Sequence, residues 1–352
     1  MKEVSIIIPI YNVEKYVAEC LNSVISQTYD HSKIECIIVN DCTTDDSMDI
    51  IDRIIKKYQS DNGKMSFNVI NHERNMGISV SRNDGIDAAK GEYVFFIDSD
   101  DYLYPDCLKS LYDAHLMHKD AELIIGNAYN EMLTSKQFDI NNIKVINNLN
   151  YLFEGSLAHY TIWNMLIKRN VLNKHNIKFK TDVSVSEDDL FNFHLYSLVN
   201  KSVIIPQITY FYRKNNKGQT LNSKFEKAPQ TLSGYISILN IYENELQGRC
   251  YVGKSFFAFN LATRAIDFLN KVRNEVPEVE LQERPLRQII NKIQKKHIRN
   301  CRPILFLMTL LATKPFEGIM RIRFYRRYFN RITMLFWKPS VLMDKILSHI
   351  QK

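Results

Sequence analysis

The chain has 352 residues, of which 45% are hydrophobic and 24% are charged, a balance typical of a globular protein and not of a disordered one. This length allows one large domain, or one domain with an appendage. The six cysteines lack the spacing of a metal site or a redox pair, so we expect reduced thiols in a cytoplasmic protein. Neither a secretory leader nor a transmembrane helix is predicted, because the apolar runs are too short.

The net charge of +7 is distributed unevenly along the chain. Residues 284–352 contain 16 Lys and Arg against 2 Asp and Glu, which gives +14, while the rest of the chain, with 30 against 37, carries −7. A basic segment behind an acidic body suggests an anionic partner, and the two candidates are a membrane surface and nucleic acid.

The first 130 residues alternate short β-rich runs with amphipathic segments. The expected strands are 4–10, 35–40, 67–71, 93–98 and 122–126, and the expected helices are 13–27, 45–58, 78–90 and 105–118. This alternation predicts βαβ units in an α/β fold, with a Rossmann-like, mostly parallel sheet flanked by helices. Ligands bind such sheets beyond the carboxyl ends of the strands.

Beyond residue 130 the expected elements are less regular. Residues 187–199 have helical periodicity, and residues 203–205 and 208–212 are strand-like, which we interpret as the second half of the same domain. From Phe225 onward the chain is predicted to be a helical extension. The expected breaks in it are Pro277, Pro285, Pro303, Pro315 and Pro339.

A cluster of carboxylates ends the strand predicted at 93–98. Residues i and i+2 of a strand point to the same side, so Asp98 and Asp100 are predicted to converge on one hard cation, Mg²⁺ or Mn²⁺. The alternative is an N-cap of the helix that is expected to begin at Pro105. Because an apolar strand delivers the two carboxylates to the ligand edge of the sheet, the metal site is favoured.

Three further carboxylates, Glu187, Asp188 and Asp189, begin the helix predicted at 187–199. At a helix start they are stabilised by the helix dipole and need have no catalytic role. The alternative is a general base that takes a proton from a hydroxyl group. No glycine-rich phosphate loop follows the first strand, which argues against a dinucleotide dehydrogenase and a P-loop enzyme.

Taken in order, the motifs of this chain resemble those of the inverting family 2 glycosyltransferases, which have the GT-A fold. The matching segments in the first half are residues 5–12 with 21–28, 39–47, 75–77 with 81–83, and 91–93 leading to Asp98. In the second half they are residues 162–166, 187–191 and 210–213. The resemblance covers residues 2–220 and leaves the C-terminal third uncovered.

The resemblance implies a role for each matching residue. The residues implied to bind the nucleotide sugar are Pro9, Tyr11, Asp41, Arg82 and Asp98. The implied metal ligands are Asp100 and Asp98, the implied catalytic base is Asp188, and the residues implied on the acceptor side are Trp163 and Glu187. Two positions depart from the family pattern: Cys42 stands where Gly is usual, and Met165 stands where Lys is common.

The implied organisation is a GT-A catalytic domain at 1–222, with a nucleotide-sugar-binding half at 1–130 and an acceptor half at 131–222, followed by a helical basic region at 223–352. The implied activity is inverting transfer of a sugar from a nucleotide sugar, most simply a UDP-sugar, to a saccharide or lipid-linked saccharide acceptor in surface polysaccharide synthesis. The reaction would be a metal-assisted single displacement with Asp188 as base.

Two alternatives remain. A nucleotidyltransferase would normally carry a glycine-rich basic loop after the first strand, where this chain has residues 9–12. A non-catalytic membrane or nucleic-acid binding module would not need the carboxylates of Asp98, Asp100 and Asp188.

The tail is predicted to contain an amphipathic helix. Arg323, Arg327 and Arg331 fall on one side of it. The apolar face consists of Ile319, Ile322, Tyr325, Phe329, Ile332 and Phe336. Packing on the catalytic domain is one interpretation, but we favour the interface of an anionic membrane, because bulky apolar residues interleaved with arginines suit lipid better than nucleic acid. We therefore expect a cytoplasmic protein, peripheral on the cytoplasmic face of the membrane, with no nucleic-acid partner.

Overall fold

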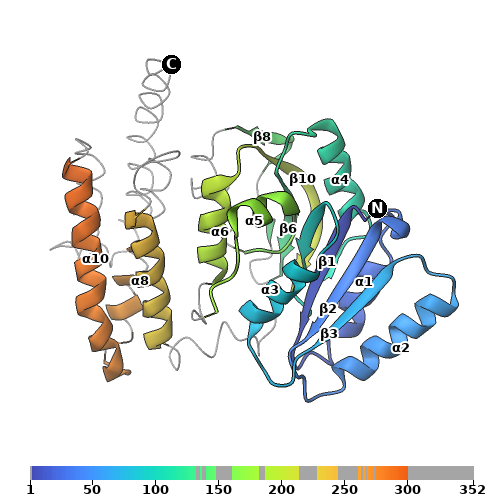
Figure 1. The fold of residues 1–352 in the computed structure, drawn as a ribbon, viewed down its shortest axis with the longest axis horizontal. Helices are drawn as coiled ribbons and strands as arrows, with labels where there is room; N and C mark the ends of the chain where they lie inside the picture. Colours follow the sequence, from blue (N-terminus) through green and yellow to red (C-terminus); the bar gives the residue numbers. More distant parts are fainter. Residues whose placement is uncertain are drawn as a thin grey trace. The chain divides into compact units, whose positions relative to one another are not determined.

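The computed structural model describes residues 2–131, 135–136, 140–147, 161–181, 187–213 and 228–244, together with 261–262, 265–266, 268–270, 272 and 274–299. The chain divides into two compact units, of which the first ends at Ser223 and the second begins at Lys224, except that Phe153–Gly155 belong to the second (Figure 1). The amphipathic helix predicted at 319–336 lies outside the described residues.

The strands of the first unit form one sheet in the order β3-β2-β1-β4-β9-β6-β10-β5, with β7 beside β6 and β8 beside β10. Figure 1 labels β1, β2, β3, β6, β8 and β10 of this sheet. Two groups of strands have parallel pairing: β1 (Val4–Ile10), β2 (Ile34–Asn40), β3 (Ser66–Asn71) and β4 (Tyr93–Phe96) in one, and β6 (Leu123–Asn130) and β10 (Ser202–Tyr212) in the other. The antiparallel strands are β5 (Tyr102–Leu103), β7 (Ser135–Lys136), β8 (Lys144–Ile146) and β9 (Met165–Lys168). Because β9 pairs with both β4 and β6, it joins the two parallel groups.

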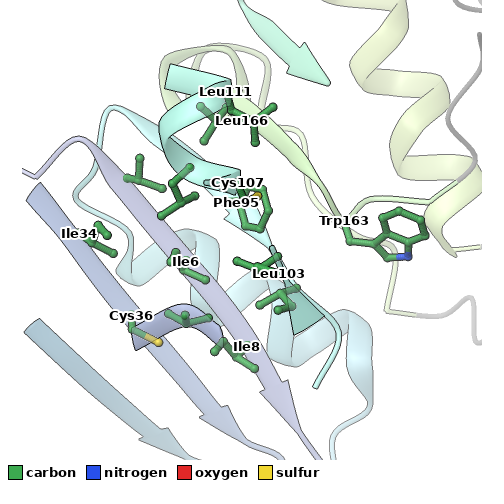
Figure 2. Packing of buried hydrophobic residues seen from close by; sticks show 14 of the residues in the cluster. Ile6, Ile8, Ile34, Cys36, Phe95, Leu103, Cys107, Leu111, Trp163 and Leu166 are labelled. Atoms are coloured by element: carbon green, nitrogen blue, oxygen red, sulfur yellow. The ribbon is translucent and has the colours of Figure 1, made fainter. Parts of the chain in front are cut away.

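Helices cover both faces of this sheet. They are α1 (Val17–Ile25), α2 (Ser47–Ser60), α3 (Ile78–Ala88), α4 (Cys107–Met117), α5 (Arg169–His175) and α6 (Glu187–Leu198), with a short 3₁₀ helix η1 (His31–Lys33). On one face, the even-numbered side chains Ile6 and Ile8 of β1 enter the core formed with α1, α2 and α4. Figure 2 shows part of this core, where Ile6 and Ile8 lie among apolar residues of neighbouring strands. The predicted α/β architecture is confirmed.

On the other face of the sheet, α3 lies close to β1. A Cβ at Gly85 would lie 2.4 Å from Cγ2 of Ile7, so only glycine allows this approach. Arg82 lies three residues before Gly85 on the same helix and is buried. The close packing of α3 therefore fixes the position of Arg82 relative to the sheet.

Several element boundaries differ from the prediction. The strand predicted at 93–98 ends at Phe96, although the N–H of Ile97 still donates to the carbonyl of Ile7. The two strands predicted at 203–205 and 208–212 are one strand, β10, whose register shifts between Ile204 and Ile208. Pro206 lies at this shift, because proline has no N–H to donate to a neighbouring strand.

In the second unit, the structure describes α8 (Ala228–Asn244), the 3₁₀ helix η3 (Pro277–Val279) and α10 (Glu280–Arg299). The predicted break at Pro285 is wrong, since α10 continues through it. A proline inside a helix costs about 3 kcal/mol, and burial of Leu286, Ile289 and Ile290 on α10 offsets that cost. Among the described residues, no helix is long and apolar enough to cross a membrane.

Candidate active site

Three carboxylates gather in the turn that follows β4. The N–H of Asp101 donates to the carbonyl of Asp98, at 3.0 Å, so the chain turns at Asp98 instead of continuing as a strand. Alternation along a strand therefore does not explain how Asp98 and Asp100 come together, and that part of the prediction is wrong. The tight turn brings the carboxylates together instead. Burial, together with repulsion from Asp98 and Asp100, raises the pKa of Asp101 well above its ordinary value.

Arg82 is the centre of the ion pairs in this region. Its Nη1 lies 2.7 Å from Oδ1 of Asp188 and 3.4 Å from Oε1 of Glu187, and its Nη2 lies 3.1 Å from Oδ1 of Asp98. The side chain of Arg82 is only 3% exposed. One buried guanidinium thus connects the predicted metal ligand Asp98 with the predicted catalytic base Asp188.

The guanidinium of Arg82 packs on a cluster of aromatic side chains. Arg82 lies over the ring of Phe179, with Cζ 5.3 Å from the ring centroid. Phe179 stacks on Phe191 of α6 at 4.1 Å, and both contact Phe96 at the end of β4 edge to face. This packing holds α6 against the end of β4, so the carboxylates at the N-terminus of α6 lie beside Asp98.

The carboxylates of α6 lie in an environment that favours protonation. Burial raises the pKa of Asp188 well above its ordinary value, Arg82 acts in the opposite direction, and repulsion from Glu187 and Asp98 adds to the increase. Burial likewise raises the pKa of Glu187. A carboxylate with a raised pKa is a stronger base than an ordinary aspartate.

The turn after β4 is also held from the side of β10. Tyr210 donates its hydroxyl to Oδ2 of Asp101 at 2.7 Å and accepts from the N–H of Asp98 at 3.2 Å. Arg213 donates its backbone N–H to Oδ1 of Asp101 and its Nε–H to the carbonyl of Asp100, both at 2.8 Å. The backbone that carries Asp98 and Asp100 is therefore fixed by residues far away in the sequence.

The residues predicted to surround the nucleotide base lie at the ends of β1 and β2. Pro9 pairs with Val39 in the ladder, and the N–H of Asp41 donates to the carbonyl of Ile10 at 3.0 Å. This places Tyr11, which is 39% exposed, next to Asp41 in the two adjacent loops. The carboxylate of Asp41 accepts from the backbone N–H of Met76 at 2.7 Å and of Gly77 at 2.8 Å. Arg82, which was predicted with them to bind the nucleotide sugar, makes ion pairs with Asp98 and with Asp188 of α6.

Two residues of these loops have left-handed backbone conformations. Asn12 has φ 53° and Cys42 has φ 58°. Cys42 occupies a position where family 2 glycosyltransferases usually have glycine. Its backbone keeps the left-handed conformation that glycine favours. A residue with a Cβ costs about 1–2 kcal/mol in this conformation, and hydrogen bonds from Thr43 and Thr44 to the side chain of Asn12 hold the adjacent loop in place.

Trp163, predicted on the acceptor side, pairs through its backbone with Phe96 at the end of β4. Its ring stacks on Tyr210 at 4.3 Å and lies 5.5 Å from Tyr212. Tyr210 is the residue that bonds to Asp101, so Trp163 is connected to the turn after β4 through one aromatic contact. Trp163 is only 4% exposed. This burial fits a residue that packs at the edge of the site better than a residue that contacts a substrate over a large area.

The donor groups in the turn fit a divalent cation that shares its coordination with a substrate. No group of three or more His, Cys, Asp or Glu side chains that could hold a metal by themselves occurs in the described part of the chain. Magnesium, however, is commonly held by one or two carboxylates, with phosphate oxygens and water completing the shell. The side chain of Asp98 is 26% exposed, so its carboxylate is accessible to such a cation.

Three residues in the site were not predicted. Asp101 is buried beneath the turn, and His72 with Asp84 forms a cluster around Asp41. His72 follows β3 directly, so the rule that placed ligands at the carboxyl ends of strands would have found it. Asp101 belongs to the carboxylate run that follows the strand, but the sequence gives it no separate role. Asp84 carries no comparable signal, because only the packed structure reveals its contacts.

The mostly parallel sheet ends in loops rich in carboxylates, and Arg82 holds a second acidic cluster against them, which is the kind of site expected of a GT-A glycosyltransferase. Residues 5–175 match the family model Glycosyl transferase family 2, so this part of the chain is a family 2 glycosyltransferase domain.

Two relatives illustrate the match in sequence. Putative glycosyltransferase EpsH of Bacillus subtilis strain 168 is 34% identical over 220 residues, which cover 60% of this chain and 60% of EpsH. Poly(ribitol-phosphate) beta-N-acetylglucosaminyltransferase TarS of Staphylococcus aureus strain Mu50 is 30% identical over 233 residues, which cover 64% of this chain and 38% of TarS. The chain thus spans less than two thirds of the length of these relatives.

Solved structures share the fold. S. aureus TarS 1-349 in complex with UDP has a TM-score of 0.66 at 21% identity, over 88% of each chain. Mannosyltransferase PcManGT of Pyrobaculum calidifontis, in complex with GDP-Man and Mn²⁺, has a TM-score of 0.56 at 13% identity, over 88% of this chain and 84% of that one. The likeness confirms the predicted GT-A fold.

Proposed function

We propose that this protein transfers a sugar from a nucleotide sugar to an acceptor hydroxyl, with inversion at the anomeric carbon. The observation that carries the proposal is the convergence of Asp98 and Asp188 on the buried guanidinium of Arg82. It brings a carboxylate of the turn after β4, on the phosphate side, and the proposed base at the start of α6 into one site. Neither a nucleotidyltransferase nor a non-catalytic binding module requires this pairing.

In the proposed reaction, Asp188 takes the proton from the attacking hydroxyl. Arg82 contacts Oδ1 of Asp188 and so orients the carboxylate, which leaves Oδ2 as the oxygen that the hydroxyl approaches. The hydroxyl oxygen forms a bond to the anomeric carbon while the bond to the nucleoside diphosphate breaks, and the proton moves to Asp188. One displacement of this kind inverts the anomeric configuration.

Asp98 and Asp100 would hold a divalent cation, Mn²⁺ or Mg²⁺, together with the diphosphate. A bound cation would supply Lewis-acid stabilisation of the departing diphosphate. The hydrogen bonds from Tyr210 and Arg213 would keep the turn in the form that presents the two carboxylates. Binding of Mn²⁺ by PcManGT, which has the same fold, supports this assignment.

Uridine is the base that we propose for the donor, with Pro9, Tyr11 and Asp41 around it. The exposed ring of Tyr11 offers a stacking surface. Among the contacts in the described residues, Oδ2 of Asp41 accepts from Gly77 alone, so one more N–H donor could bind there. The UDP complex of TarS supports this choice. The acceptor we propose is a saccharide or lipid-linked saccharide in surface polysaccharide synthesis, with Trp163 and Glu187 on its side.

A panel of nucleotide sugars tests the proposal, with release of the nucleoside diphosphate measured in the presence of Mn²⁺ or Mg²⁺. We expect turnover of at least one UDP-sugar, lost in excess chelator. Asp100→Ala should lower turnover by several orders of magnitude, because the cation loses a ligand and the diphosphate loses its partner. Full turnover by Asp100→Ala, or by wild type in excess chelator, would remove the metal from the mechanism.

We further propose that the basic segment 284–352 holds the enzyme on the cytoplasmic face of a membrane, close to a lipid-linked acceptor. Each basic residue near an anionic surface contributes about 1 kcal/mol, so the net +14 of this segment would give salt-sensitive binding. We expect the full chain to co-sediment with anionic vesicles at low salt and to be released at high salt. Equal recovery in the supernatant with anionic and neutral vesicles would contradict this part of the proposal.

A further inference from the structure

His72 lies between two carboxylates that come from different elements. It follows the carboxyl end of β3, and its Nδ1 lies 2.7 Å from Oδ1 of Asp41, in the loop after β2. Its Nε2 lies 2.9 Å from Oδ2 of Asp84, on α3. The side chain of His72 is only 8% exposed, whereas that of Asp84 is 42% exposed.

These contacts determine the charge of the ring. An ionised carboxylate only accepts hydrogen bonds, so a ring that contacts one through each nitrogen must donate from both, and this requires the imidazolium. Asp41 and Asp84 are the charged groups that contact the ring in the described part of the chain. Burial alone would lower the pKa of His72, but the hydrogen bonds to Asp41 and Asp84 raise it above its ordinary value.

Asp41 connects the ring of His72 to the loop at residues 76–77. The oxygen that accepts from His72 also accepts from the N–H of Met76, and the second oxygen accepts from the N–H of Gly77. Gly77 has φ 90° and is the residue directly before α3. Because Asp84 lies on α3 itself, the ring is bonded both to the helix and to the carboxylate that holds the loop preceding it.

We infer that His72 is a positioning residue for the nucleotide: as an imidazolium, it fixes the carboxylate of Asp41 and, through it, the backbone of residues 76–77 beside the base. His72 would touch neither the base nor the reacting atoms. The inference rests on the proposed function, since it concerns the same nucleotide site. It adds a residue to which neither the motifs nor the ion pairs around Arg82 assign a role.

The test compares His72→Gln with His31→Gln. His31 is a matched control, because both of its nitrogens also have partners, but these are the neutral hydroxyl of Tyr58 and the carbonyl of Gln27. We expect His72→Gln to weaken UDP binding, measured by calorimetry, by about tenfold, the value of one charged hydrogen bond. The KM for the donor should rise with it while kcat stays nearly unchanged, because the base at Asp188 is untouched. His31→Gln should change neither.

Two further measurements separate this inference from the proposed function. Hydrogen exchange at the amides of Met76 and Gly77 should accelerate in His72→Gln and not in His31→Gln. In ¹⁵N-histidine spectra of the wild type, both ring nitrogens of His72 should carry protons at pH 7. Asp84→Asn, which keeps His72 but removes one of its two carboxylate partners, should lower the pKa of the ring.

The outcomes are distinct. Unchanged exchange at both amides, unchanged UDP affinity in His72→Gln, or a singly protonated ring in the wild type would each overturn the role of His72. A wild-type protein that binds no UDP would contradict the uridine donor, and the exchange rates would still decide whether His72 holds the loop.

Discussion

Asp188→Asn is expected to bind the donor normally and to lose transfer by about 10²- to 10⁴-fold, the usual effect of removing a general base. The amide has nearly the size of the carboxylate and can keep an oxygen toward Nη1 of Arg82, so the site should stay intact. It cannot, however, take up a proton from the acceptor. Rates of transfer and affinity for UDP, measured on the same preparation, separate the two effects.

Asp113→Asn serves as the control for this variant. Asp113 lies on α4 and pairs with Lys109 on the surface, so its replacement should leave both rate and affinity unchanged. If Asp188→Asn remains active and Glu187→Gln is inactive, the base is the other carboxylate that contacts Arg82.

Arg82→Met is expected to lower the free energy of unfolding by about 3–5 kcal/mol, the range found when one partner of a buried ion pair is removed. Without the guanidinium, Asp98, Glu187 and Asp188 would repel one another in a partly buried site, and the already raised pKa values of Glu187 and Asp188 would rise further. Denaturant unfolding measures the loss, and its midpoint should be compared at several pH values.

The stability lost in Arg82→Met is expected to depend on pH. A carboxyl whose pKa is higher in the folded state than in the unfolded state binds its proton more tightly when folded, so stability falls as the pH rises through that range. The deficit of Arg82→Met should therefore be larger at pH 8 than at pH 5. Arg169→Met is a suitable control, because Arg169 bonds to the carbonyls of Lys90 and Gly91 and to no carboxylate among its described contacts. A deficit in Arg82→Met no larger than in this control would contradict the central role of Arg82.

The alternation of apolar strands and amphipathic helices in residues 4–118 is a local signal, and it predicts the parallel part of the sheet correctly. β9 and α5 were not predicted, because β9 has four residues and is stabilised by pairing with strands that are distant in sequence. The continuous α10 was missed for a similar reason, since burial of its apolar face outweighs the local effect of Pro285.

The candidate site follows the same division. Asp98 and Asp188 can be singled out from the sequence because carboxylates at the end of a strand and at the start of a helix are local patterns. Their connection through Arg82 cannot, because Arg82 and Asp188 are 106 residues apart and meet only through the packing of Phe96, Phe179 and Phe191. The cluster of His72, Asp41 and Asp84 likewise forms only because three elements meet at the carboxyl ends of the strands.

The central claim is a single inverting displacement with a nucleotide sugar as donor. Proton NMR of the anomeric region, recorded during turnover of an α-linked UDP-sugar with water or sugar as acceptor, tests it most directly. The account predicts that the β-anomer appears first, in step with release of UDP, and that both form about 10²- to 10⁴-fold more slowly with Asp188→Asn. Initial formation of the α-anomer, or no turnover of any nucleotide sugar by the wild-type protein, would contradict it.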